Sequence, residues 1–300
     1  MSDAHAKPIV GIFWMFVTGL LFVAVTAVVK YMGPRVPPAE MAFLRYVLGL
    51  VFLIPVLRPL VQTRLTARQW KLFGLRGAFH ALGVMLWFYA MTRIPIAEVT
   101  AMNYLSPVYV AIGAALFLGE RLAARRIAAI FIALVGVAVI LRPGFREVEA
   151  GHVAMLICAI VFAGSYLLAK IMADETKPAV VVAMLSIFVT IGLTPFAIAV
   201  WVTPTGTELA LLFLVACLAT AGHYTMTMAF AAAPVTVTQP ITFLQLVWAV
   251  LLGAVVFAEP VDGWVILGGL LILGAVTYIT LREAALKRRA MTPPSPATKL

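Results

Sequence analysis

Charged residues are scarce in this chain of 300 residues. Only 11% of its residues are Asp, Glu, Lys or Arg, whereas 64% are hydrophobic, and the mean hydropathy is +1.08. A water-soluble domain carries roughly a quarter of charged residues, so a polar shell around an apolar core is excluded. The sequence therefore predicts an integral membrane protein whose main partner is the lipid bilayer.

Several signatures of chemistry are also absent. The two cysteines, Cys158 and Cys217, both fall inside apolar runs, so neither a disulfide framework nor a metal site is expected. No Gly-Lys-Ser/Thr phosphate loop is present, and neither a catalytic dyad nor a cofactor motif is visible. We therefore expect no cofactor, no ATP-driven pump and no enzyme. An intramembrane enzyme stays an alternative that a covalent adduct or a bound metal would revive.

The charges that are present lie mostly between long apolar runs. Lys and Arg outnumber Asp and Glu by 22 to 12, which in a soluble chain would suggest a nucleic-acid partner. Between apolar runs, such charges instead set the orientation in the membrane, so no nucleic acid is expected. Loop Lys and Arg favour one side by about three to one. This bias predicts a multi-pass protein of the bacterial inner membrane with both termini in the cytoplasm.

The apolar runs are long enough to cross a membrane, because a helical crossing needs about 20 residues. We expect an all-α integral membrane fold of ten transmembrane helices. The runs cover about 8–31, 38–57, 70–92, 95–118, 124–141, 151–173, 178–201, 208–232, 235–257 and 261–281. Pro107 and Pro240 are expected to break the fourth and ninth of these helices.

The second half of the chain repeats the first. Pro95 and Glu120 recur 139 positions later as Pro234 and Glu259; at a spacing of 140 the recurring pairs are Gly11 and Gly151, Met15 and Met155, Phe22 and Phe162, and Lys30 and Lys170. An odd number of crossings per copy forces the second copy to enter the membrane from the opposite side. We thus expect a first five-helix repeat at 8–145 and an inverted repeat at 150–284. Residues 285–300 have the composition of a disordered basic tail.

With these features in view, the chain resembles the ten-helix EamA-type exporters of the drug/metabolite transporter superfamily. The similarity rests on the ten-crossing repeat and on the runs Ile94-Pro95-Ile96-Ala97-Glu98-Val99-Thr100 to Leu118-Gly119-Glu120 and Pro234 to Phe257-Ala258-Glu259. Among these families, the bacterial aromatic amino-acid exporters are the nearest fit. The resemblance also implies peripheral fifth and tenth helices, where homodimer contacts could form. Because Glu98 maps to Val237 and Arg45 to Leu185, symmetric ion-coupling carboxylates are not expected.

Polar and aromatic residues near the middle of several runs are candidates for a substrate cavity. Their depth follows from the helical rise of about 1.5 Å per residue. Uncharged polar groups at one depth also hydrogen-bond neighbouring helices as packing contacts, which is the simpler interpretation of any one of them. The expected cavity residues are His80, Trp87, Asn103, Ser106, Tyr166, His223, Tyr224, Gln245 and Trp248. His80 and His223 are candidates either for proton sensing or for a hydrogen bond to the substrate.

Charged residues within the runs form a second group of candidates, because ionisable groups in lipid are costly and usually paired or functional. Glu40, Arg45, Glu98 and Lys30 are all expected in the outer half of the membrane. The simplest interpretation is an Arg45–Glu98 ion pair that clamps two helices. The functional alternatives are a gate, or capture of a zwitterion by Arg45 at its carboxylate and Glu98 at its ammonium.

Together these features predict a secondary transporter that exports amino acids or related small metabolites by alternating access. Aromatic amino acids are the favoured cargo, moved by a facilitator or a weakly proton-coupled carrier. The alternatives are an importer of a metabolite such as S-adenosylmethionine, and a small-molecule channel whose flux does not saturate.

Overall fold

The computed structural model describes residues 8–118, 124–233 and 235–291, and all of the helices and turns below lie in these ranges. Glu120 and Pro234 of the repeated motif, and residues 292–300, lie outside the described residues. In the described part, nine helices are long and apolar enough to cross a membrane, and a tenth apolar helix, Leu244–Phe257, is shorter. The described fold is therefore the all-helical membrane architecture that the apolar runs predict.

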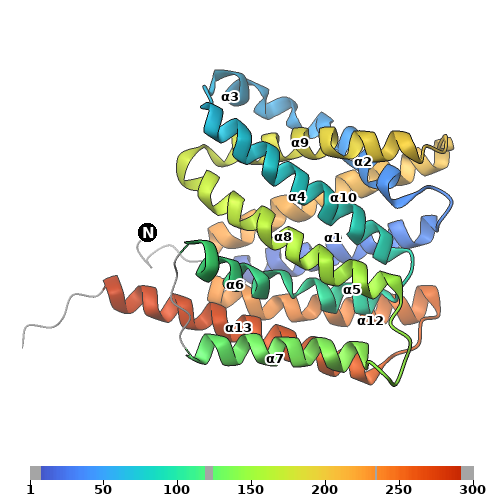
Figure 1. Ribbon diagram of the computed structural model, residues 1–300, viewed down its shortest axis with the longest axis vertical. Helices are drawn as coiled ribbons and strands as arrows, with labels where there is room; N and C mark the ends of the chain where they lie inside the picture. The colour runs from blue at the N-terminus through green and yellow to red at the C-terminus, as the bar shows by residue number, and fades with distance from the viewer. Residues whose placement is uncertain (1–7, 119–123, 234, 292–300) are drawn as a thin grey trace, which may run out of the picture.

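Seven crossings are single continuous helices, lying side by side across Figure 1. They are α1 (Pro8–Met32), α4 (Ala67–Met91), α7 (Ala124–Leu141), α8 (Ala150–Glu175), α9 (Pro178–Ala199), α10 (Gly206–Ala232) and α13 (Gly263–Met291). The second crossing is made of α2 (Pro38–Gly49) and the 3₁₀ helix η2 (Leu50–Val56), followed by the short α3 (Leu57–Gln62). Because α13 runs to Met291, the first part of the expected disordered tail is helical instead.

The fourth and ninth apolar segments are interrupted, as the two prolines predict. The fourth is divided into α5 (Ile96–Asn103) and α6 (Ser106–Leu118), and the ninth into α11 (Val235–Thr238), the 3₁₀ helix η3 (Gln239–Thr242) and α12 (Phe243–Phe257). A proline lacks the backbone N–H and its ring clashes with the carbonyl four residues earlier. For Pro107 that residue is Asn103, where α5 ends. The break predicted at Pro107 is confirmed, and Pro240 lies within η3.

The two halves of the chain pack against each other throughout the bundle. Helix α1 packs on α10, α4 on α8, α2 on α9, and α7 on α13. Each of these contacts joins a helix of the first half to one of the second. Figure 1 shows α1 beginning at the left and α8 beginning at the right, so the first helices of the two halves run in opposite directions.

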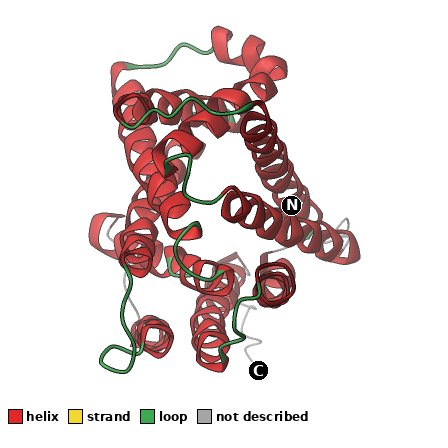
Figure 2. Cartoon of the chain, turned by 90° about the vertical axis from the view of Figure 1, so that its right-hand side faces the viewer, coloured by secondary structure: helices red, strands yellow, loops and turns green. Residues whose placement is uncertain are grey.

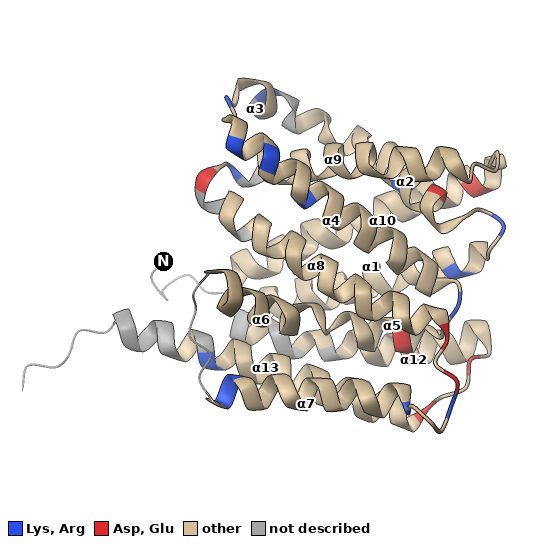
Figure 3. Cartoon of the chain, in the orientation of Figure 1, with Lys and Arg blue, Asp and Glu red and all other residues tan. Residues whose placement is uncertain are grey.

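Charged residues gather at the two ends of the bundle and leave its middle largely uncharged (Figure 3). We name the left end of Figure 1 the basic end; α4 begins there with Arg68 and Lys71, and α7 with Arg125 and Arg126. We name the right end of Figure 1, where α8 begins, the network end. Figure 2 views the molecule from the network end. Between the two ends, large apolar side chains face outward; Phe117 and Val255, for example, are each 81% exposed. Such a surface is suited to lipid contact, because exposed apolar patches of this extent are rare on soluble proteins.

The closest approach between α7 and α13 depends on two glycines. A Cβ atom built on Gly268 would lie 2.4 Å from the carbonyl oxygen of Gly136, and one built on Gly136 would lie 2.7 Å from that of Gly268. Small residues at such crossings let helix backbones pack closely in lipid, where dispersion contacts hold helices together.

Replacement of Gly268 by valine is expected to destabilise the protein by about 1–3 kcal/mol, because the added atoms force α7 and α13 apart. The measurement is the melting temperature of the purified protein in detergent. Gly274→Val is the matched control on the same helix, since a Cβ atom at Gly274 meets nothing within 4 Å. Equal melting temperatures for the two variants would contradict the observed packing of α7 on α13.

Candidate functional site

A cavity of about 220 Å³ lies between the two halves, at the level of the helix breaks. It is lined by residues of both halves: Met15, Thr18, Gly19, Phe22, Arg45, Tyr46, His80, Val84, Trp87, Asn103, Phe162, Tyr166, His223, Met226, Thr242 and Gln245. Aromatic rings and uncharged polar groups predominate in this lining. No carboxylate is among the described residues that line the cavity, and Arg45 is the one permanently charged residue among them.

Two histidine–phenylalanine contacts flank this central cavity. The ring of His223 on α10 lies edge-on to Phe22 on α1, with centroids 5.2 Å apart. The ring of His80 on α4 lies 4.9 Å from that of Phe162 on α8. Phe22 and Phe162 are equivalent positions of the sequence repeat, so in each half a phenylalanine at the same position contacts a histidine of the other half. This arrangement places one imidazole from each half beside the central cavity.

Hydrogen bonds between the halves hold the walls of the cavity in place. The hydroxyl oxygens of Thr18 on α1 and Thr225 on α10 are 2.8 Å apart. His80 Nδ1 lies 3.2 Å from Ser165 Oγ on α8. The Tyr104 hydroxyl, at the break between α5 and α6, donates to the Thr242 carbonyl in η3 at 2.9 Å. The two broken crossings are therefore directly linked beside the cavity.

The structure brings together six of the nine residues predicted to line a cavity: His80, Trp87, Asn103, Tyr166, His223 and Gln245. The other three lie elsewhere. Tyr224 is 65% exposed, because neighbouring residues on a helix point about 100° apart and His223 takes the inward direction. Trp248 packs edge-on against Phe16, with ring centroids 5.8 Å apart. Ser106 is buried in α6, and its hydroxyl has no hydrogen-bond partner.

Sequence reasoning missed five cavity-lining aromatic or hydroxyl residues, Thr18, Phe22, Tyr46, Phe162 and Thr242. Phe22 and Phe162 carried a signal, because both belong to the set of residues that recur at the repeat spacing. Thr18, Tyr46 and Thr242 carried no such signal, since threonine and tyrosine also occur throughout the lipid-facing and packed surfaces of the chain.

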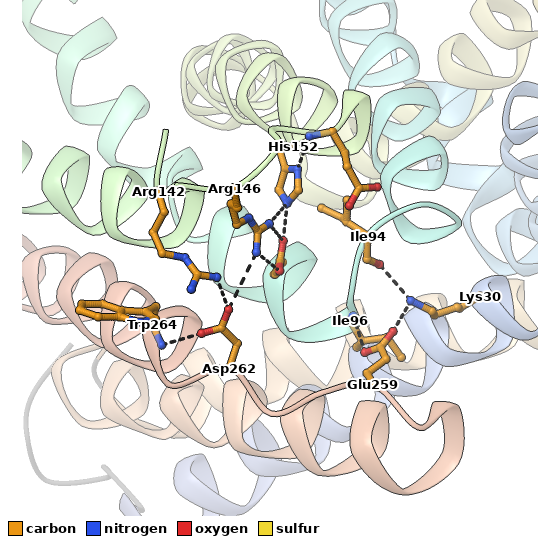
Figure 4. Close-up of polar contacts among 11 residues, drawn as sticks. Lys30, Ile94, Ile96, Arg142, Arg146, His152, Glu259, Asp262 and Trp264 are labelled. Carbon is orange, nitrogen blue, oxygen red and sulfur yellow. Dashed lines mark hydrogen bonds and ion pairs between the residues drawn. The ribbon is translucent and has the colours of Figure 1, made fainter. Parts of the chain in front are cut away.

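A second site, at the network end, is centred on Glu98 in the first turn of α5. The Glu98 carboxylate is buried and accepts two hydrogen bonds from the Arg146 guanidinium, at 2.9 and 2.8 Å. It also pairs with Nε2 of the fully buried His152 on α8. The backbone N–H of Glu149 donates to His152 Nδ1 at 3.0 Å, so the proton of a neutral imidazole lies on Nε2 and is donated to Glu98. Figure 4 shows these contacts.

Two further ion pairs adjoin this centre (Figure 4). Lys30 of α1 pairs with Glu259 and also donates to the Ile94 carbonyl at 3.0 Å, while Glu259 accepts from the backbone N–H of Ile96 at 2.9 Å. Arg142 pairs with Asp262, which also accepts from the backbone N–H of Trp264 at 2.8 Å. We call the side chains of Lys30, Glu98, Arg142, Arg146, His152, Glu259 and Asp262 the charged network.

The charged network joins the two halves of the chain. Glu98 and Lys30 belong to the first half, His152, Glu259 and Asp262 to the second, and Arg146 to the loop between them. The carboxylates of Glu98 and Glu259 lie at the N-terminal end of α5, where backbone N–H groups favour negative charge. The hydrogen bonds from Arg146 to Glu98 raise the pKa of this arginine further above its ordinary value, so the guanidinium remains charged.

The predicted Arg45–Glu98 pair is wrong, and of the four charged residues expected in the outer half of the membrane only Lys30 and Glu98 belong to the charged network. Glu98 pairs with Arg146 and His152 because the 142–149 loop folds back over the start of α5. The Glu40 carboxylate accepts the backbone N–H of Val202 at 2.8 Å, and Lys30 pairs with Glu259. Arg45 lies on a different side of α2 from Glu40, and it lines the central cavity.

Comparisons with known proteins agree with this architecture. The profile of the EamA-like transporter family matches twice, over residues 9–142 and 149–281. A riboflavin transporter of Rhizobium johnstonii is 30% identical over 95% of both chains. An S-adenosylmethionine uptake transporter of Rickettsia felis is 25% identical over 94% of this chain and 96% of its own. A pseudopaline exporter of Pseudomonas aeruginosa is 24% identical over 88% of this chain and 94% of its own.

A crystal structure 22% identical in sequence superposes with a TM-score of 0.62, over 92% of this chain and 99% of its own, which shows the fold. None of the three named relatives is an aromatic amino-acid exporter, so the finer resemblance that the sequence suggested is not supported by them. The relatives match this chain over nearly its whole length and are all transporters. The chain belongs to the EamA-like transporter family and is a multi-pass membrane transporter.

Proposed function

We propose that this protein is a carrier for a flat, neutral or anionic heteroaromatic metabolite, with riboflavin as the leading cargo. The observation that carries the proposal is the chemistry of the central cavity, which has aromatic walls, two amides, two imidazoles and one arginine. The 30% identity to a transporter named for riboflavin supports the same cargo.

The walls of the cavity match a flat ring system with a polar edge. Tyr46, Trp87, Phe162 and Tyr166 offer ring faces and edges for stacking, and aromatic contacts of this kind add about 0.5–1.5 kcal/mol beyond area burial. Side-chain amides such as Asn103 and Gln245 each donate and accept hydrogen bonds. Riboflavin presents a flat tricyclic ring, an edge of alternating carbonyl and N–H groups, and a hydroxylated chain. Each of these parts has a complementary partner type in the cavity.

Cationic cargoes fit the cavity less well. S-adenosylmethionine carries a sulfonium and an ammonium, and an aromatic amino acid carries an ammonium that needs an acceptor or a carboxylate in a dry site. Glu98, the carboxylate that the sequence suggested for this role, is held by Arg146 and His152 at the network end. Export of aromatic amino acids, which the sequence favoured, is therefore the competing proposal.

Transport would proceed by alternating access between two inverted five-helix repeats, at 8–145 and 150–284. The loop charges support an orientation with both termini in the cytoplasm of a bacterial inner membrane, so the network end would face outward. The charged network would then be the closed outer gate. The cavity of about 220 Å³ is below the ~300–1,000 Å³ usual for ligand sites, so it has to widen when the cargo enters.

Purified protein in liposomes is expected to exchange riboflavin across the membrane with saturable kinetics and counterflow. The measurement is uptake of labelled riboflavin into liposomes preloaded with unlabelled riboflavin, with and without a pH gradient. The same liposomes are tested with labelled tryptophan, phenylalanine and S-adenosylmethionine. Exchange of an amino acid in the absence of riboflavin exchange would overturn the cargo proposal, and flux that does not saturate would indicate a channel.

Tyr166→Ala is expected to weaken riboflavin binding by roughly tenfold, the equivalent of about 1.4 kcal/mol of lost stacking. Flavin fluorescence quenching on titration with detergent-purified protein reports this affinity. Tyr224→Ala is the matched control, because it removes a tyrosine that faces outward from the bundle. If the two variants bind riboflavin equally well, the cavity is not the cargo site.

Glu98→Gln is expected to open the outer gate more often. Removing one partner of a buried ion pair destabilises the paired state by about 3–5 kcal/mol, which here is the closed state. A single cysteine at Met226, which lines the cavity, in a cysteine-free background should react at least tenfold faster with an impermeant thiol reagent added outside.

The control for the gate experiment is Arg35→Gln, which breaks the exposed Arg35–Glu208 pair at the same end of the bundle. Exposed pairs contribute little to stability, so the labelling rate of this control should match that of the parent protein. An equal rate in the Glu98→Gln protein would exclude the charged network as the gate.

A further inference from the structure

Arg45 is a membrane-embedded cation without a balancing anion in the described parts of the chain. It lies in the Pro38–Pro55 crossing and lines the central cavity. Its one described close contact is with the ring of Tyr46, whose centroid is 4.2 Å from the guanidinium carbon. Arg45 is half-buried. A stacked ring offsets part of the cost of removing a cation from water, but no hydrogen-bond acceptor of the described residues reaches the guanidinium.

The charged and titratable groups described around Arg45 supply no negative charge to balance it. His80 and His223 both line the cavity and interact electrostatically with Arg45, and Arg76 lies within range of His80. Arg76 itself is buried and donates to the Val181 carbonyl at 3.0 Å. The described carboxylates nearest in sequence are engaged elsewhere, Glu40 with the backbone of Val202 and Glu98 with Arg146. Described groups of the protein therefore leave the Arg45 charge uncompensated.

A purely structural role for Arg45 is the simpler interpretation. Arg93 is an example of an arginine in such a role. The Arg93 guanidinium also lies 4.2 Å from a tyrosine ring, that of Tyr89. Arg93, however, lies in the turn after α4, outside the crossings, where water can hydrate it. Arg45 makes the same ring contact within a crossing, where an unpaired cation is costly and marks a binding site or an ion pathway.

We propose that Arg45 is the residue that orients and selects the cargo, by donating to an edge of acceptor oxygens on a flat aromatic molecule and by repelling cations. The guanidinium presents paired N–H donors in a rigid plane, which match the two oxygens of a carboxylate or a phosphate, or neighbouring acceptors at the edge of a ring. The aromatic walls hold the body of the cargo while Arg45 binds its polar edge. This inference rests on the proposed carrier function and specifies the charge of its cargo.

Selection by charge is tested with three probes that share one ring system. The probes are 2-naphthoate, 2-naphthamide and 2-naphthylmethylammonium, and their binding to the full-length protein in detergent is measured by titration calorimetry. The unmodified protein is expected to bind the anion and the neutral amide at least tenfold more tightly than the cation, because both offer an acceptor oxygen to Arg45, whereas the guanidinium repels the ammonium. A site that binds the cation as tightly as the anion would overturn the inference.

Variants of Arg45 separate selection from folding. Arg45→Gln should remove the preference for the anion over the cation, and Arg45→Glu should reverse it. Arg45→Lys keeps the charge but not the planar donor pair, so it should still exclude the cation while binding naphthoate several-fold more weakly. Arg93→Gln is the matched control and should preserve the order of the three probes. Unchanged order in a folded Arg45→Gln protein would show that Arg45 serves packing alone.

Riboflavin titration of the same proteins distinguishes this inference from the proposed function. If the unmodified protein and the Arg45→Gln variant bind riboflavin equally tightly, the proposed role of Arg45 is contradicted, whereas the carrier proposal is supported. The unmodified protein could instead fail to bind riboflavin but bind the naphthalene probes in an order that depends on their charge and on Arg45. That result would contradict the cargo proposal and support Arg45 as the selecting residue. Size-exclusion profiles confirm that each variant is folded.

Discussion

The hydrocarbon core of a membrane provides no water to hydrogen-bond a free peptide group, and the rest of this structure depends on that constraint. Most crossings satisfy it as continuous helices. The fourth and ninth apolar segments do not, because each is interrupted near a proline, and the freed backbone groups must find partners within the protein. The Tyr104 hydroxyl bonding to the Thr242 carbonyl is one such solution. Asn103 and Thr242, beside the two breaks, both line the cavity, so the interrupted helices and the polar site occupy the same place.

The same constraint separates the charged residues into two groups with different chemistry. At the network end, carboxylates from both halves pair with arginine, lysine or histidine, and three pairs of the charged network cross between the halves. In the central cavity, Arg45 has an aromatic ring but no carboxylate among the described residues. Paired charges can hold one end of a bundle closed, whereas an unpaired charge is available to a ligand. The arrangement supports an outer gate and a cargo site as distinct parts of one carrier.

Residue spacing predicted much of the fold but only part of the candidate site. Counting residues along a helix gives the depth of each residue in the membrane. The count therefore predicts that His80, Asn103, His223 and Gln245 lie at one level. Counting does not show which way a side chain points when every face of a helix is apolar. Tyr224 has the same depth as His223 but faces outward. The Arg45–Glu98 prediction failed for a related reason, because nothing in the spacing shows that the 142–149 loop returns over α5.

The sequence by itself determined the membrane environment, the helical crossings, the internal repeat and the two helix breaks, because these follow from hydrophobic length, from recurring residues and from the missing N–H of proline. Only the tertiary structure decided which groups meet. It placed Arg146 and His152 on Glu98, set Phe22 and Phe162 against the two histidines, and left Arg45 facing the cavity. These contacts join residues far apart in the chain, and they depend on how each helix is rotated against its neighbours.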